Sequence, residues 1–201
     1  KDGENLAVLC DGHSVVALWN VYDRKCTPFE TNLKDPSFMS WSRVGPQLAI
    51  GTAKGSLLMY NSETKKSNYI QGKHSKKITC GMWNLENRLA LASLDKTMSI
   101  NDDKGELLEQ PKLKYDPFDV QFAEQKVDEK QGTSKENTVS VNMGHQTILM
   151  YNMTDQDNPV ELAFQPKYGE IATYKWFGDG YMMVGFSKGY IIAISTHMKE
   201  I

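Results

Sequence analysis

Residues 72–101 carry the pattern that decides the fold, and they read GKHSKKITCGMWNLENRLALASLDKTMSIN. One run of strand-like residues ends on Trp83, and two further apolar runs, 89–93 and 97–101, flank a short turn that contains Asp95. Apolar runs of this length that meet at a polar turn are typical of a β-hairpin. The stretch therefore predicts one strand followed by a hairpin.

The same layout recurs along the chain at intervals of about 40 to 50 residues. Five hairpins end at equivalent positions, which are Trp19, Tyr60, Ile100, Tyr151 and Ile194. Four of them follow an additional run with an aromatic end, at Trp41, Trp83, Phe122 and Trp176. Extended pieces between the units supply a fourth strand. Four-stranded antiparallel sheets that repeat in this way are the signature of a WD-repeat β-propeller.

The sequence thus predicts an all-β chain that forms part of one WD-repeat β-propeller, with about four to five blades. The expected blades are residues 1–34, 35–72, 73–113, 114–167 and 168–201. The first unit lacks an initial strand, and the last stops after a third. Because open sheet edges promote aggregation unless they are covered, we expect a segment of a longer propeller protein.

One segment also allows a helical interpretation. Pro117 follows Asp116, as at a helix start, and Phe118 and Phe122 lie four residues apart. Phe118, Val120 and Phe122 also alternate, and they align with the strand of the preceding unit that ends on an aromatic residue. We therefore expect a strand here.

An insertion at residues 123–138, AEQKVDEKQGTSKENT, lengthens one connection. The stretch is rich in charge and contains no aromatic residue, so it has little to bury, and a surface loop is expected. Such a loop is either a tolerated insertion or a contact with a partner.

His74, Ser93 and Asp95 are the residues that most resemble a reactive group, since serine, histidine and aspartate also form acyl-transfer triads. In WD repeats these residue types instead form a buried hydrogen-bond network within a blade, and such networks are costly when half satisfied. We expect the structural network. Ile100 stands where tryptophan would end it.

Other features argue against catalysis. The phosphate-loop, dinucleotide, metalloprotease and nucleophile-elbow motifs are missing, and the four histidines are scattered over different units. We expect no catalytic residue, no cofactor and no metal site. A cage of tryptophans for a methylated or carbohydrate ligand is one interpretation, but their common position at strand ends favours packing between blades.

Composition narrows the class of partner and compartment. A formal net charge of −2 disfavours nucleic acid as a partner. No apolar stretch reaches the ~18 residues of a membrane span, so an integral membrane protein is not expected. Cys10, Cys26 and Cys80 suggest neither a disulfide framework nor a zinc site, which fits a reducing cytoplasm.

A small basic cluster precedes the third unit at Lys73, Lys76 and Lys77. The simplest interpretation is a solvated loop. A functional one is contact with an acidic peptide or with membrane phosphoinositides.

Three runs carry a more specific resemblance: GKHSKKITCGMWNLENRLAL at 72–91, WSRVGPQLAIGTAKGSLLMYN at 41–61 and GFSKGYIIAISTHMKE at 185–200. They resemble the first propeller of the WD-repeat 19 family, whose members are subunits of intraflagellar transport complex A. The resemblance implies a non-enzymatic scaffold in retrograde axonemal transport and in ciliary entry of membrane proteins. It implies a hetero-oligomer with other complex A subunits and ciliary membrane cargo adaptors. The implied location is the cytoplasm and the cilium or flagellum, with its basal body and axoneme.

Two alternatives remain open from the sequence. One is a WD-repeat scaffold of another assembly, such as a vesicle coat or a ubiquitin ligase. The other is an enzyme built on a propeller, which would need titratable groups that converge on one substrate position.

Overall fold

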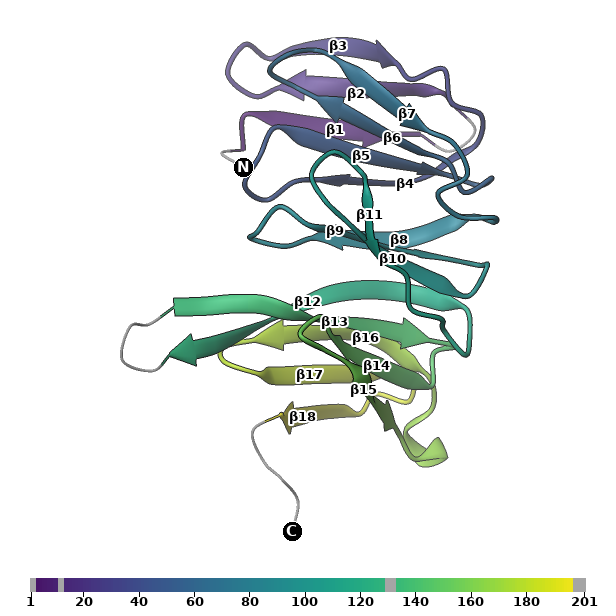
Figure 1. The fold of residues 1–201 in the computed structure, drawn as a ribbon, viewed down its shortest axis with the longest axis vertical. Coiled ribbons are helices and arrows are strands. Elements are labelled where there is room, and N and C mark those ends of the chain that lie inside the picture. The colour runs from purple at the N-terminus through teal and green to yellow at the C-terminus, as the bar shows by residue number, and fades with distance from the viewer. Residues whose placement is uncertain (1–2, 11–12, 129–132, 197–201) are drawn as a thin grey trace. The chain divides into compact units, whose positions relative to one another are not determined.

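The computed structural model describes residues 3–10, 13–128 and 133–196, and between residues 124 and 135 it describes the backbone alone. Strands dominate this part of the chain, and a single 3-10 turn, Pro166–Tyr168, interrupts them. The chain divides into two compact units, Lys1–Lys112 and Leu113–Ile201. Each sheet lies within one unit and is an antiparallel meander of consecutive strands (Figure 1).

The first unit contains three sheets. Three strands form the first: β1 (Asn5–Leu9), β2 (Val15–Asn20) and β3 (Lys25–Glu30). Four form the second: β4 (Pro36–Trp41), β5 (Gln47–Thr52), β6 (Leu57–Asn61) and β7 (Ser67–Ile70). Four form the third: β8 (Ile78–Trp83), β9 (Leu89–Ser93), β10 (Thr97–Asn101) and β11 (Leu107–Glu109).

The second unit contains two sheets. Four strands form the first: β12 (Pro117–Asp128), β13 (Thr133–Met143), β14 (Thr147–Asn152) and β15 (Asp155–Ala163). Three form the second: β16 (Ile171–Phe177), β17 (Tyr181–Phe186) and β18 (Ile191–Ser195). The expectation of a strand after Asp116 is confirmed, since β12 begins at Pro117.

Burial falls from the inner strands of each four-stranded sheet to the outer one. Every residue of β9 is buried, as are all but the first of β5, which explains why these strands read as continuous apolar runs. The outer strands β7 and β11 are mostly exposed. They therefore contribute polar surface rather than core.

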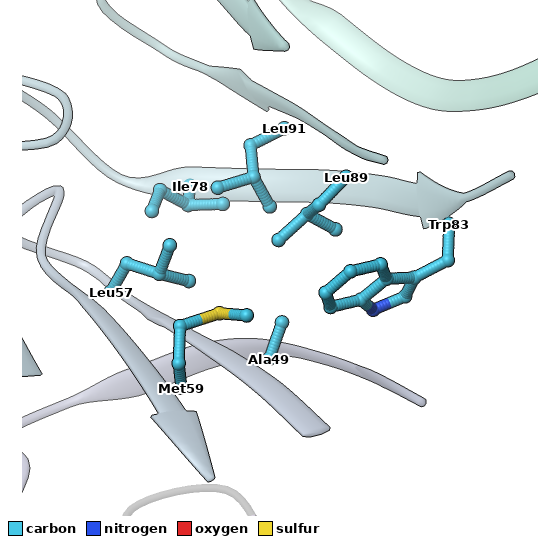
Figure 2. Packing of buried hydrophobic residues seen from close by; sticks show 7 residues of the cluster. All are labelled: Ala49, Leu57, Met59, Ile78, Trp83, Leu89 and Leu91. Atoms are coloured by element: carbon cyan, nitrogen blue, oxygen red, sulfur yellow. The ribbon is translucent and has the colours of Figure 1, made fainter. Parts of the chain in front are cut away.

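Side chains from neighbouring sheets form the core of the first unit. Figure 2 shows Leu89 and Leu91 of β9 facing Leu57 and Met59 of β6, with the Trp83 ring beside them. Leu57, Leu89 and Leu91 are fully buried, and complete burial of one such side chain stabilises a fold by about 1.5–3 kcal/mol. The two sheets are therefore held together chiefly by apolar contact.

The register corrects one of the five hairpin positions. In the second sheet, Trp41 lies opposite Leu48, which lies opposite Tyr60. In the third sheet, Trp83 lies opposite Leu89, which lies opposite Asn101. Ile100 pairs instead with Ala90. Both residues belong to β10, so the predicted strand is confirmed. The residue equivalent to Tyr60, however, is Asn101 and not Ile100.

The insertion at residues 123–138 differs from the expected surface loop. Strands β12 and β13 extend through most of it, with Ala123 opposite Thr138 and Gln125 opposite Lys135. Ala123, Glu136 and Thr138 are buried. Composition suggests a loop because it reports only on side chains, whereas the backbone hydrogen bonds that pair β12 with β13 are available to almost any residue. The expectation for residues 129–132 lies outside the described residues.

Candidate functional site

His74 lies in the loop between β7 and β8 and is bonded through both ring nitrogens. Its Nδ1 lies 3.2 Å from Asp95 Oδ2 and 3.0 Å from Thr97 Oγ1, and its Nε2 lies 2.9 Å from Ser99 Oγ. The imidazole is buried, with 3% of the residue exposed. Strand β10 supplies Thr97 and Ser99, and the β9–β10 turn supplies Asp95.

Asp95 organises the turn around it. Its carboxylate accepts hydrogen bonds from the Ser75 amide at 2.8 Å, from the Thr97 amide at 3.0 Å and from the Thr97 hydroxyl at 2.7 Å. Burial alone would raise the pKa of Asp95, but these hydrogen bonds and nearby His74 outweigh burial, so its pKa lies below the ordinary value. The carboxylate is therefore ionised at neutral pH.

These partners fix the protonation of the ring. Burial lowers the pKa of His74, and the Asp95 carboxylate only partly opposes this effect. A carboxylate can only accept, so Nδ1 carries the proton that faces Asp95, and Nε2 accepts from the Ser99 hydroxyl. His74 is thus a neutral link between the Asp95 turn and strand β10.

Ser99, rather than Ser93, is the serine at the ring. The Ser93 hydroxyl donates to Lys76 O at 3.1 Å and accepts from the Asp95 amide at 3.1 Å, so Ser93 supports the turn without touching His74. A signal for Ser99 exists in the sequence. Thr97, Ser99 and Asn101 alternate along one strand, and alternate residues share a face.

Asn101 extends the network toward the inner strands. Its Nδ2 donates to Leu89 O at 3.0 Å and to Ser99 Oγ at 3.1 Å. Asn101 is fully buried. In the other four hairpins, the equivalent register position is held by Trp19, Tyr60, Tyr151 and Ile194. An amide therefore ends the hydrogen-bond chain at the position of a large side chain.

The order Ser99–His74–Asp95 repeats the connectivity of an acyl-transfer triad. Ser99 is completely buried and His74 nearly so. A nucleophile must reach the substrate atom that it attacks, and the Ser99 hydroxyl has no open approach. This arrangement supports the blade rather than a reaction.

The loops at one end of these strands are joined by backbone hydrogen bonds. Ala53 N donates to Asp35 O and His74 N to Gly55 O, both at 2.8 Å, and Leu94 N donates to Lys77 O at 2.9 Å. We call residues 31–35, 53–55, 71–77, 94–96 and 110–112 the basic loop surface. Its cations are Lys34, Lys54, Lys73, Lys76, Lys77, Lys96 and Lys112, and its acidic residues are Asp35 and Asp95.

The lysines of this surface outnumber its carboxylates by seven to two. Within the described part of the chain none of the seven lysines forms an ion pair with a carboxylate. Six are exposed. The seventh, Lys73, is partly buried, and desolvation lowers its pKa although Glu106 and Asp102 oppose this effect. The sequence-predicted cluster Lys73, Lys76 and Lys77 is thus one part of a larger surface.

The connections at the other end of the strands are balanced in charge. These connections are residues 21–24, 42–46, 62–66, 84–88 and 102–106. Their cations are Arg24, Arg43, Lys65, Lys66, Arg88 and Lys104, and their anions are Asp23, Glu63, Glu86, Asp102, Asp103 and Glu106. Positive charge in the first unit is therefore concentrated at one end, although the whole chain carries a formal charge of −2.

A groove of about 760 Å³ lies at this basic end, and we call it the β3–β7 groove. Ser67, Tyr69 and Gln71, alternate residues at the edge of the second sheet, line one part of it. The remaining wall comes from the end of β3, the loop that follows it and the β5–β6 connection, with Glu30, Lys34 and Lys54 as its charged residues.

Among the described residues, no group of three or more histidine, cysteine, aspartate or glutamate residues is arranged to hold a metal ion. The same residues contain no helix of the length and hydropathy that a bilayer crossing requires.

Comparison with known proteins places this fold in a family. A family model described as the WDR19 first beta-propeller matches residues 1–201. WD repeat-containing protein 19 is 43% identical in Mus musculus and 40% identical in Homo sapiens, each over 202 residues. WD repeat-containing protein dyf-2 of Caenorhabditis elegans is 33% identical over 205 residues. Each match covers the whole chain and 15% of the relative's length.

Solved structures agree on the architecture. Sqt1 of Saccharomyces cerevisiae aligns with a TM-score of 0.74 at 14% identity, over 98% of this chain and 58% of that one. The Cps50 (Swd1) beta-propeller domain of Myceliophteria thermophila aligns with a TM-score of 0.66 at 16% identity, over 83% and 54%. The fold is a partial WD-repeat β-propeller, and the chain belongs to the WDR19 first beta-propeller family.

Proposed function

We propose that this chain is part of the N-terminal propeller of a non-enzymatic scaffold subunit of intraflagellar transport complex A. The observation that carries the proposal is a match along all 201 residues to the WDR19 first beta-propeller, with relatives 33% to 43% identical. The five sheets would be blades of one propeller, near residues 1–34, 35–72, 73–113, 114–167 and 168–201. The subunit would act in the cilium or flagellum, in retrograde transport and in the entry of membrane proteins.

The mechanism would be display of binding surfaces on a rigid support. A propeller holds its loops in fixed positions because the strands that carry them are buried and paired. The network around His74 ties the β7–β8 loop to β10, and that loop carries Lys73, Lys76 and Lys77. We propose these lysines as contacts with a complex A subunit or a cargo adaptor. Burial of the residues that resemble a triad supports a role without turnover.

The test is purification of the tagged full-length protein from ciliated cells. We expect other complex A subunits in fixed proportion, and shortened cilia or material stranded at ciliary tips when the protein is lost. Recovery with vesicle-coat or ubiquitin-ligase subunits instead would assign the scaffold to another assembly. Recovery as a lone monomer, with normal cilia after deletion, would refute the proposal.

The lysine contacts are tested separately in the same purification. Lys73→Gln, Lys76→Gln and Lys77→Gln together should reduce the recovery of one partner. The matched control is Lys65→Gln with Lys66→Gln, which removes charge from the balanced end of the same unit. Equal recovery from both variants would show that the cluster is only a solvated loop.

A further inference from the structure

We propose that the β3–β7 groove binds an extended, acidic segment of a protein partner. This inference rests on the proposed scaffold function and deepens it, because it names the chemistry of one partner segment. Three features of the groove support it: the shape, the polarity of the lining and the sign of the surrounding charge.

The shape suits an extended chain. Ser67, Tyr69 and Gln71 line the groove from the outer edge of the second sheet. Among the strands that the structure describes, β7 pairs with β6 alone, on its inner side. The backbone groups on the outer side of an edge strand are free to meet another extended segment. A peptide that lies along β7 would present alternate side chains to the groove.

The lining combines apolar and polar groups. Leu33 and Leu58 are buried beneath the groove, whereas Tyr69 is 53% exposed and offers both an aromatic face and a hydroxyl group. Binding sites typically combine apolar surface with a few polar groups that fix orientation. The groove therefore has apolar area for affinity beside hydroxyl and amide groups for hydrogen bonds.

The charge selects an acidic occupant. Lys34 and Lys54 line the groove, both are exposed, and neither has a carboxylate partner in the described part of the chain. The other lysines of the basic loop surface raise the positive potential, which acts over a Debye length of about 8 Å at physiological salt. Lysine ammonium groups act as separate point charges, so each can pair with a different carboxylate along an extended acidic segment.

One residue gives the groove a direction. Glu30 lines it at the end of β3 and would repel a carboxylate placed nearby. The bound segment should therefore carry its acidic residues near Lys34 and Lys54 and an uncharged or basic residue near Glu30. This arrangement predicts opposite effects for substitutions in the same groove.

The test uses the full-length protein and a short fluorescent peptide in which Glu and Asp alternate with Leu and Phe. Its control peptide replaces every carboxylate with the amide. In fluorescence anisotropy, the double substitution Lys34→Gln with Lys54→Gln should weaken binding of the acidic peptide about tenfold. Both lysines are replaced together because one exposed lysine–carboxylate ion pair contributes little by itself. Glu30→Gln should strengthen it, and Lys65→Gln with Lys66→Gln should leave it unchanged within about twofold.

Three outcomes would overturn the inference. The first is equal binding of the two peptides, and the second is insensitivity to both the Lys34/Lys54 and the Glu30 substitutions. The third is lysine-dependent binding to vesicles with phosphatidylserine when the acidic peptide does not bind, which would assign the surface to a membrane. If complex A subunits co-purify with the full-length protein but the protein does not bind the acidic peptide, the groove inference is refuted and the proposed function stands. If they do not co-purify at all, the proposed function fails independently of the groove.

Discussion

Among the described side chains around the β9–β10 turn, that of Asp95 accepts the largest number of hydrogen bonds. It accepts from two backbone amides, from the Thr97 hydroxyl and from the His74 ring. Loss of this carboxylate leaves the buried His74 ring and the partly buried Thr97 donors without their acceptor, and an unsatisfied buried donor costs more than the net contribution of the bond itself. The network is therefore most vulnerable at this residue.

Asp95→Ala should lower the free energy of unfolding by about 1–3 kcal/mol, because His74 and the Ser75 and Thr97 amides lose their acceptor. Chemical denaturation of the parent and the variant measures this change. Asp23→Ala is the matched control, since Asp23 is exposed in the β2–β3 turn. Unchanged stability of the Asp95 variant would refute a structural role for the network.

His74 should make stability depend on pH in a defined window. Its pKa in the folded protein lies below the ordinary 6.5 because the ring is buried. As the pH falls below about 6.5, the unfolded chain takes up a proton that the folded chain does not, so stability falls. Asp95 contributes in a different window, since its pKa lies below 3.8 and its contribution is lost only at more acid pH.

Melting temperatures between about pH 5 and pH 8 test this assignment. The parent should lose stability below about pH 6.5. His74→Asn should be less stable at neutral pH, and its melting temperature should decline less on acidification because one titrating group is gone. Parallel curves for the two proteins would show that His74 does not titrate between these limits.

The β5–β6 turn depends on Gly55 for two separable reasons. Its φ of +81° lies in the left-handed region, and a Cβ added there would lie 2.0 Å from His74 O. The same residue receives the His74 amide hydrogen bond that joins the β5–β6 and β7–β8 connections. A side chain at this position would therefore separate two parts of the basic loop surface.

Gly55→Ala should lower the free energy of unfolding by more than 2 kcal/mol, roughly the sum of a left-handed backbone penalty and a steric clash. Gly72→Ala is the matched control, because Gly72 has a φ of +66° and nothing within 4 Å of an added Cβ. Its loss should be only about 1 kcal/mol. Equal losses would mean that the backbone of residue 74 moves aside at no cost.

Some apolar residues of the first sheet are exposed, although the residues at the same register positions in the second sheet lie in the core. Leu6 lies opposite Trp19 just as Leu48 lies opposite Tyr60. Leu6 and Trp19 are 57% and 40% exposed, whereas Leu48 and Tyr60 are 0% and 4% exposed. A further blade of the full-length protein would bury the exposed pair in the same way.

The indole groups support this expectation. Trp83 Nε1 donates to Ser40 O at 3.1 Å and Trp176 Nε1 to Ser140 Oγ at 2.7 Å, in each case on another sheet of the same unit. Trp41 Nε1 is buried and has no acceptor among the described residues. A strand that pairs with the free edge of β1 would supply one, as β4 does for Trp83.

In the full-length protein, a cysteine introduced by Leu6→Cys should react slowly with a thiol reagent, in a background where Cys10 and Cys26 are replaced by serine. Tyr69→Cys in the same background should react quickly, because Tyr69 is 53% exposed on an outer strand. Rates measured by mass spectrometry compare the two sites. Similar rapid labelling of both would show that no blade covers the first sheet.

The sequence by itself determined the all-β repeat, the order of the strands and the His74–Asp95 pair, because strand alternation, turn residues and a short motif are local signals. The alternation of Thr97, Ser99 and Asn101 shows that these three residues share a face, but it does not show that this face meets His74 or that Asn101 rather than Ile100 is equivalent to Tyr60. Strand register decides both points, and register depends on pairing with residues far along the chain. Only the tertiary structure gathered seven lysines from five loops at one end of the first unit, with Lys34 and Lys54 in the lining of a groove, because the pairing of strands brings those loops to the same end.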